Sequence, residues 1–426
     1  MKRVVTFLLA AGLVFAVAAP AIAVPPSSDP KTDARYAAAW LAGQVNASGF
    51  IPQAANPASP NLSVSAQAVT ALAAARVGRE KVAALLGYLG NHVDEFVAGS
   101  GTDDPGALAY LILAAVAGGD DPTSFGSAHA NLVTRLTSGQ QPDGLFGAGD
   151  PTFDGAFRQG LALLALHSAG VANAAGVTWL EGRQCADGSW TAFRADTTVP
   201  CPAVDPNTFT GPDTNSTALA VLGLHAQGDA AQSSNGVAAL DAVRNAGGGW
   251  GFLARNDQVT DANSTGLVLE ALRTVNGVAD DQGVSALLAL QVGCTGVVAD
   301  RGGIAFQPGA GGKLAPDALA TAQATPALAE VALPVTSTSI SADVPTPCAS
   351  TATTTVSTTT STTVAVTGTT VGSTGSTVPA SVAAVAAAAN TQLPRTGASS
   401  GPIAIVAACL LALGLVFVAG TRRRRA

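Results

Sequence analysis

The residues best suited to chemistry recur along the chain in one short pattern. An aspartate is followed by Asn, Ser and Thr in two copies, which contain Asp213, Asn215 and Ser216, and Asp261, Asn263 and Ser264. Two related copies place Gln67 and Gln323 after a hydroxyl residue and an alanine. Carboxylates and amides that converge in a cleft could transfer a proton or hold a ligand by hydrogen bonds. The pattern therefore marks the candidate site.

Helix capping explains the same aspartates without catalysis. Each copy opens an Ala- and Leu-rich stretch, and an Asp side chain that precedes a helix accepts hydrogen bonds from the free amides of the first turn. Asp154 stands at an equivalent place. We expect Asp154, Asp213 and Asp261 to be caps. A general acid or base role in a glycan lyase or hydrolase is the alternative.

Metal and cofactor chemistry has little support in the sequence. The histidines are scattered singly and the cysteines form no C-x-x-C pair, whereas zinc sites need clustered ligands. The acidic pairs that begin at Asp103, Asp120 and Asp280 lie next to or near Gly or Pro, which predicts solvated turns. We therefore expect neither a metal nor a cofactor.

The cysteines predict two disulfides. Cys409 lies in an apolar run near the C-terminus, and the four others are Cys185, Cys201, Cys294 and Cys348. Four cysteines in an exported chain indicate two disulfides, for which three connectivities are possible. The simplest pairing joins Cys185 to Cys201 and Cys294 to Cys348. The first bond would close a local loop, and the second would tie the start of the tail to the domain.

The N-terminus has the three parts of a secretory signal peptide. Lys2 and Arg3 precede an apolar stretch over residues 4–19, and Ala21-Ile22-Ala23 forms a small-x-small cleavage site. This order is typical of a signal that is removed on export. We expect residues 1–23 to be cleaved; an uncleaved membrane anchor is the alternative.

The C-terminus carries a second signal. Leu393-Pro394-Arg395-Thr396-Gly397 precedes an apolar segment over residues 402–420 and a basic tail over residues 421–426. The apolar segment is long enough to span a bilayer, and arginines hold such a tail on the cytoplasmic side. The arrangement resembles the LPxTG cell-wall sorting signal. That resemblance implies that a sortase cleaves after Thr396 and joins it to peptidoglycan; a single-pass membrane anchor is the alternative.

The composition of the part between the two signals indicates a domain followed by a stalk, and it argues against a nucleic-acid partner. Without the terminal signals the chain has 28 acidic and 15 basic residues, a net charge of −13, whereas nucleic-acid binding requires a basic surface. Residues 336–390 are rich in Thr, Ser, Val and Ala with almost no charge, which predicts a disordered stalk. Residues 32–333 form one domain with an internal repeat.

The repeat predicts six pairs of helices. One helix of each pair ends in a Gly-rich turn with an aromatic residue, as at Asp187-Gly188-Ser189-Trp190, and the next begins at the capped pattern. Sustained β-branched runs occur only in the stalk, so the domain is predicted to be all-α.

These motifs resemble the prenyltransferase/squalene-cyclase repeat. The resemblance rests on W-L-x-x-x-Q-x-x-D-G-S-W at residues 179–190 and on the repeated D-x-N-S-T-x-L. It implies an α/α toroid of six helix pairs, a fold that hosts unrelated functions. The sequence has no D-x-D-D motif of the cyclases, no parts for a prenyltransferase zinc site, and only 5% aromatic residues.

We therefore expect a non-catalytic toroid that binds an unknown extracellular ligand. Its candidate site is a polar ring at one end of the inner helices, formed by Gln67, Asp213, Asn215, Ser216, Asp261, Asn263, Ser264 and Gln323. The alternative is a secreted enzyme on the same fold, either terpenoid cyclase-like or acting on a glycan.

Overall fold

The computed structural model describes residues 27–98, 102–151, 154–336 and 339–348. These ranges contain thirteen α-helices, and their only β-structure is a set of isolated bridges. None of the helices in this part of the chain is long and apolar enough to cross a bilayer. The predicted signal peptide (1–23), sorting motif (393–397), apolar segment (402–420) and basic tail (421–426) lie outside the described residues, as does most of the predicted stalk.

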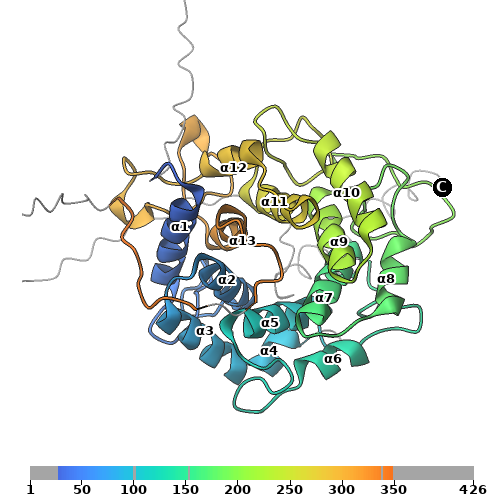
Figure 1. Ribbon diagram of the computed structural model, residues 1–426, viewed down its shortest axis with the longest axis horizontal. Coiled ribbons are helices and arrows are strands. Elements are labelled where there is room, and N and C mark those ends of the chain that lie inside the picture. Colours follow the sequence, from blue (N-terminus) through green and yellow to red (C-terminus); the bar gives the residue numbers. More distant parts are fainter. Residues whose placement is uncertain (1–26, 99–101, 152–153, 337–338, 349–426) are drawn as a thin grey trace, which may run out of the picture. The chain divides into compact units, whose positions relative to one another are not determined.

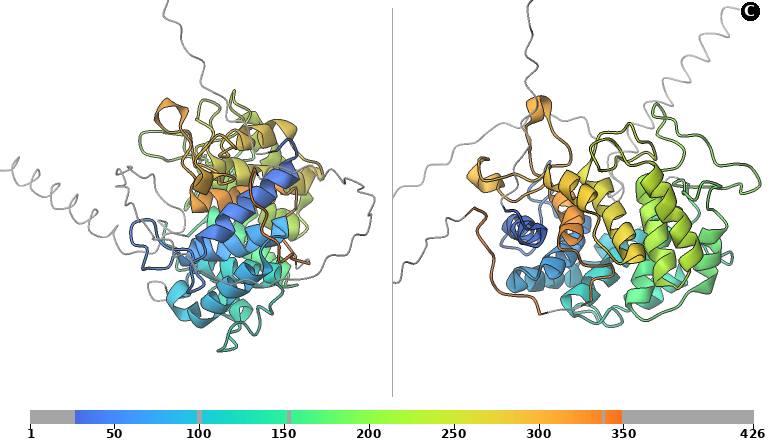
Figure 2. Two further views of the ribbon diagram at one scale, coloured as in Figure 1. Left: turned by 90° about the vertical axis from the view of Figure 1, so that its left-hand side faces the viewer. Right: turned by 45° about the horizontal axis from the view of Figure 1, so that its top comes forward.

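Six helices form a closed inner ring (Figure 1). They are α2 (Leu62–Ala75), α5 (Pro105–Gly118), α7 (Ala156–Ser168), α9 (Thr214–Ala226), α11 (Ala262–Asn276) and α13 (Ala318–Leu328). Each packs against the next in this order, and α13 packs against α2 to complete the circle. The turned views in Figure 2 show these helices lying alongside one another. The ring confirms the predicted all-α toroid.

The remaining helices surround this ring (Figure 1). They are α1 (Pro30–Gln44), α3 (Arg79–Asn91), α4 (Val93–Val97), α6 (Leu132–Ser138), α8 (Ala174–Glu181), α10 (Ala230–Ala242) and α12 (Asp281–Leu288). At least one of them precedes each inner helix in the chain; all but α6 pack against the inner helix that follows, and α6 packs against α5. The predicted order of outer helix, turn and inner helix is therefore confirmed in all six units.

The inner helices are rich in alanine and are buried along most of their length. Alanine favours helix formation and allows close helix packing. In α9 every residue from Thr214 to Leu224 is buried, and in α13 every residue from Ala320 to Leu328. Helices that are buried on all sides leave little room between them.

The two turns that carry a tryptophan hold the outer helices before them. Trp190 and Trp250 are fully buried. The indole N–H of Trp190 donates to the carbonyl of Leu180 in α8 (2.9 Å), and that of Trp250 donates to Leu240 in α10 (2.7 Å). Each ring thus packs beneath the helix that precedes its own turn.

The compact unit extends further than the sequence predicted. It reaches Cys348, whereas the predicted domain ended at residue 333 and the predicted stalk began at residue 336. The backbone N–H of Gly78 donates to Asp343, and that of Arg79 donates to Ser341. The disulfides Cys185–Cys201 and Cys294–Cys348 are both present, which confirms the predicted pairing. Structural disulfides indicate a location outside the reducing cytoplasm.

Candidate functional site

The N-termini of the inner helices lie at one end of the toroid. Each inner helix follows an outer helix, so the six run in the same direction. Backbone bonds connect this end around part of the ring: the first N–H of α7, α9 and α11 donates to a carbonyl of the loop that precedes the next inner helix. These bonds are Ala156 N to Ala192 O, Thr214 N to Phe252 O, and Ala262 N to Phe306 O. We call the loops before the inner helices the rim loops.

Asp213 and Asp261 are helix caps, as predicted. Asp213 Oδ1 accepts from the backbone N–H of Ser216 (2.7 Å), and Asp261 Oδ1 accepts from that of Ser264 (2.7 Å). Both residues are 2% exposed. Burial raises the pKa of Asp213 to about 6 and the pKa of Asp261 to about 6, although the cap hydrogen bonds lower both.

Asp154 is not a cap, and this part of the prediction was wrong. The N-cap of α7 is Gly155, which has no side chain. Asp154 Oδ2 instead accepts from the backbone N–H groups of Gly149 (2.7 Å) and Asp150 (2.9 Å) in its own rim loop. A local pattern could not distinguish these roles, because both need an acidic residue just before the helix.

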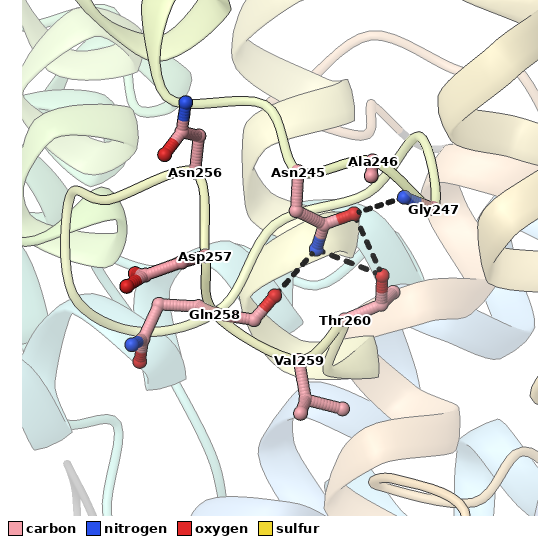
Figure 3. Close-up of a pocket in the computed structure, with 8 residues that line it drawn as sticks. All are labelled: Asn245, Ala246, Gly247, Asn256, Asp257, Gln258, Val259 and Thr260. Carbon is pink, nitrogen blue, oxygen red and sulfur yellow. Dashed lines mark hydrogen bonds between the residues drawn. The ribbon is translucent and has the colours of Figure 1, made fainter.

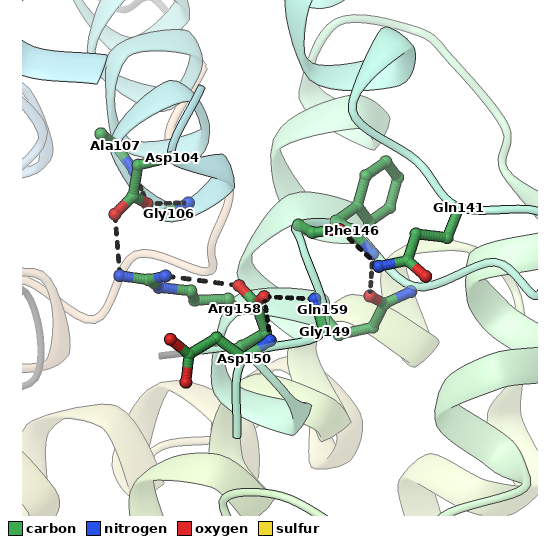
Figure 4. A network of polar contacts seen from close by, with 11 residues as sticks. Asp104, Gly106, Ala107, Gln141, Phe146, Gly149, Asp150, Arg158 and Gln159 are labelled. Atoms are coloured by element: carbon green, nitrogen blue, oxygen red, sulfur yellow. Dashed lines mark hydrogen bonds and ion pairs between the residues drawn. The ribbon is translucent and has the colours of Figure 1, made fainter. Parts of the chain in front are cut away.

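An arginine connects Asp154 to a neighbouring helix. Arg158 of α7 donates to Asp154 Oδ1 (3.4 Å) and to Asp104 Oδ2 (2.8 Å). Asp104 Oδ1 caps α5 through Gly106 N (2.8 Å) and Ala107 N (3.1 Å), as Figure 4 shows. Arg158 therefore bridges two carboxylates and joins α5 to the loop before α7.

The acidic pairs are therefore not simple solvated turns. Asp103 forms two hydrogen bonds with Arg135 (2.7 and 2.9 Å). Asp280 caps α12 through Gly283 N (2.7 Å) and pairs with Arg244. Asp120, Asp121 and Asp281 are exposed as predicted. The sequence missed these roles because the arginine partners lie 32 and 36 residues away.

A hydroxyl position explains much of the repeated pattern. Four residues after the cap, Thr217, Thr265 and Thr321 each accept from the backbone N–H of the residue after a Gly turn: Trp190, Trp250 and Ile304, at 3.0 Å in each case. Ser65 accepts from Ile51 in the same way (3.0 Å), and Gln159 accepts from Phe146 (2.9 Å; Figure 4). Ser65 and Thr321, two residues before the predicted glutamines, therefore bind the turns to the inner helices.

The predicted polar ring is mostly buried and only partly joined. Gln323 Nε2 of α13 donates to Gln67 Oε1 of α2 (2.9 Å), which closes the ring of helices. Asp213 with Ser216 and Asp261 with Ser264 form separate caps, and the Ser264 hydroxyl donates to Asp261 Oδ2 (3.0 Å). Seven of the eight residues are less than 10% exposed, and Asn263 is half-buried. Six of the eight side chains, those of Gln67, Asp213, Asn215, Asp261, Ser264 and Gln323, form hydrogen bonds within the toroid.

The rim loop over residues 191–212 is held by covalent and hydrogen bonds but exposes apolar side chains. The Cys185–Cys201 disulfide and a bridge between Thr191 and Pro212 close it. Arg194 donates to the carbonyls of Gln184, Thr197 and Val199. Yet Val199 is 51% and Phe209 43% exposed. The sequence located this loop and its disulfide, but not the exposed phenylalanine.

Two pockets of the described part lie outside the ring. The pocket in Figure 3 has a volume of about 280 Å³ and is lined by Asn245, Ala246, Gly247, Asn256, Asp257, Gln258, Val259 and Thr260. Asn245 donates to the carbonyl of Gln258 and accepts from Gly247 N, so its amide closes the loop. The second, of about 480 Å³, lies against α3. Within the described ranges no three His, Cys, Asp or Glu side chains gather closely enough to hold a metal ion.

Comparison with known proteins gives similarity in fold only. No family model and no curated protein matches the sequence. Among solved structures, an inactive variant of the α-1,6-mannanase GH76A of Salegentibacter is 13% identical over 72% of this chain and 100% of its own, with a TM-score of 0.47. The type II terpene cyclase MstE from Scytonema is 16% identical over 71% of this chain and 96% of its own (TM-score 0.43). The Candida albicans protein geranylgeranyltransferase-I is 10% identical over 61% of this chain and 82% of its own (TM-score 0.41). At these identities and scores the likeness does not extend to activity or ligand.

Proposed function

We propose that the chain is an exported surface protein whose toroid is a non-catalytic binding domain. In this proposal the signal peptide directs export, a sortase joins Thr396 to peptidoglycan, and residues after Cys348 hold the toroid away from the wall. The two disulfides are consistent with this location.

The state of the carboxylates supports binding rather than catalysis. A general acid or base must reach the proton that it transfers. Asp213 and Asp261 are 2% exposed and occupied as caps, and Asp104 and Asp154 are bonded to Arg158 and to backbone amides.

One observation carries the choice of binding face: the rim loop over residues 191–212 is locked in shape and presents Phe209 and Val199 to solvent. Asp205 holds the tip through Asn207 N (2.8 Å) and the Thr208 hydroxyl (3.0 Å), and it bridges to Thr210. Rigid loops that expose an aromatic side chain lose little entropy when they bind. This loop is therefore the proposed contact surface for the ligand.

The experiment compares binding and turnover in one set of variants. Purified protein is titrated with peptidoglycan sacculi, soluble wall glycans and isoprenoid-lipid vesicles, and products are sought in the same samples. We expect saturable binding to a wall preparation without product, and at least a tenfold loss of affinity in Phe209→Ala. Val278→Ala is the matched control, because Val278 is 65% exposed in the connection after α11, away from the rim loops. Equal binding by both variants would contradict the proposed face, and product formation would contradict the non-catalytic role.

Anchoring is tested separately, by mass spectrometry of protein released from the wall by a muralytic enzyme. We expect a C-terminal peptide that ends at Thr396 and carries a peptidoglycan fragment. Recovery of residues 397–426 on the wall-linked protein would instead indicate a membrane anchor.

A further inference from the structure

Glu270 is a buried carboxyl in α11 that has no partner. The residue is 1% exposed, and neither carboxylate oxygen has a hydrogen-bond partner among the described residues. Asn263 Oδ1 and Thr274 Oγ1, which lie on the same face of α11, are also buried without a partner. An uncompensated carboxylate in such a place is strongly unfavourable. Burial accordingly raises the pKa of Glu270 well above its ordinary value.

The repeat shows that this is a core position. Glu270 is the ninth residue after the cap of its helix, and the same position holds Thr70, Leu113, Leu164, Leu222 and Pro326 in the other inner helices. Three of the five are leucines. A glutamate is therefore the exception at a place where the other units put an uncharged side chain.

The charged groups around Glu270 offer it no bond. Its own helix contributes Arg273, which lowers its pKa without a hydrogen bond to it. On the packed helices α9, α10, α12 and α13 and at their ends, the titratable or charged residues are Asp213, His225, Asp229, Asp241, Arg244, Asp280, Asp281, Asp317 and Glu330. Asp213, Asp229 and Asp317 are caps, Arg244 pairs with Asp241 and Asp280, and Glu330 pairs with Lys31. Asp281 is exposed, and His225 is half-buried.

Glu270 also lies beside the contact between α11 and α13 in the inner ring, which we call the seam. Gly266, one turn earlier on the same face of α11, is so near α13 that a Cβ there would lie 2.7 Å from the carbonyl oxygen of Gln323. Gln323 in turn bonds to Gln67 of α2. Hydration of a charged Glu270 thus requires α11 and α13 to separate. The Cys294–Cys348 disulfide encloses α13, so a separated α13 stays tethered at both ends.

We propose that protonation of Glu270 controls closure of the ring: the neutral acid permits contact between α11 and α13, and the carboxylate opens this seam. The opening exposes the Gln67–Gln323 pair. The inference is independent of the binding role proposed above.

Hydrogen–deuterium exchange of the full chain between pH 5 and 8, corrected for intrinsic rates, tests the proposal. If the seam opens alone, the opening constant for α13 amides rises about tenfold per pH unit between the ordinary and the raised pKa of Glu270. Amides of α7 should show less of this increase. For the α13 amides, Glu270→Gln should lower the slope of the logarithm of the opening constant against pH by about one. Glu270→Leu should lower that slope equally and should also slow exchange of these amides at every pH.

Two controls separate Glu270 from other carboxyls. Glu95→Gln, at an exposed position of α4, should keep the wild-type slope. Asp213→Asn with Asp261→Asn keeps both caps but removes their two buried carboxylates, and it should leave the Glu270 contribution in α13 unchanged. An unchanged α13 slope in Glu270→Gln would overturn the proposal. An equal loss of slope in α7 and α13 would also overturn it, because it would indicate global unfolding.

Discussion

Gly160 of α7 and Gly223 of α9 meet backbone to backbone. A Cβ on Gly223 would lie 2.4 Å from the carbonyl oxygen of Gly160, and a Cβ on Gly160 would lie 2.2 Å from the carbonyl oxygen of Leu219. No side chain fits between the two helices at this point. The contact explains how α7 and α9 can pack so closely in the inner ring.

Alanine at either glycine should therefore be severely destabilising. Gly160→Ala and Gly223→Ala force the backbones apart, and we expect each to lower the free energy of unfolding by about 3 kcal/mol or more. Gly43→Ala is the matched control, because it lies in α1 with no atom within 4 Å of the added Cβ. That change should stabilise by about 0.5–1 kcal/mol, since glycine is unfavourable inside a helix. Denaturant titration of all three variants measures the difference, and a tolerated Gly223→Ala would disprove the close contact.

The buried caps should make stability depend on pH. The folded pKa values of Asp213 and Asp261 are raised to about 6, above the ordinary value of about 3.9. Protonation of these two carboxyls therefore contributes to the free energy of unfolding. This contribution is fully present below about pH 4 and is lost as the pH rises through about 6.

Asparagine caps as well as aspartate and carries no charge, so Asp213→Asn and Asp261→Asn should each stabilise by on the order of 1–3 kcal/mol at pH 7. Asp213→Ala should be about 1 kcal/mol less stable than Asp213→Asn, because it removes the acceptor for Ser216 N. The control is Asp317→Asn, which changes an exposed cap of α13 and should leave the pH profile unaltered. Thermal melts from pH 4 to 8 decide the matter; parallel profiles for wild type and Asp213→Asn would refute the buried-charge account.

The two disulfides should differ in their contribution. Cys185–Cys201 closes 16 residues and Cys294–Cys348 closes 54. Chain entropy predicts stabilisation of about 3 and about 4 kcal/mol, respectively. Replacing each pair by alanines and comparing unfolding in urea gives both values. In addition, loss of Cys294–Cys348 should free the segment 339–348 from α2 and α3, which limited proteolysis would detect.

Features encoded close together in the chain were predictable from the sequence. The helix pairs and the Asp213 and Asp261 caps follow from local patterns, and the two disulfides match the simplest of the three possible pairings. The bond between Arg158 and Asp104 joins residues 54 apart, and the Gly160–Gly223 contact depends on how two helices cross. Asp154 was misassigned because its partners, Gly149 and Asp150, lie in the preceding loop. Glu270 carries no sequence signal of its own until the repeat is aligned on its caps.

The central claim, that the carboxylates at the ends of the inner helices are structural and not catalytic, is tested by turnover measured beside folding. Wild type, Asp213→Asn and Asp261→Asn are incubated with isoprenoid substrates and wall glycans, and the melting temperature of each preparation is recorded. The account predicts no product from any of the three proteins, with both variants folded. Product formed by the wild type and abolished by Asp213→Asn or Asp261→Asn in a protein that still folds would contradict it.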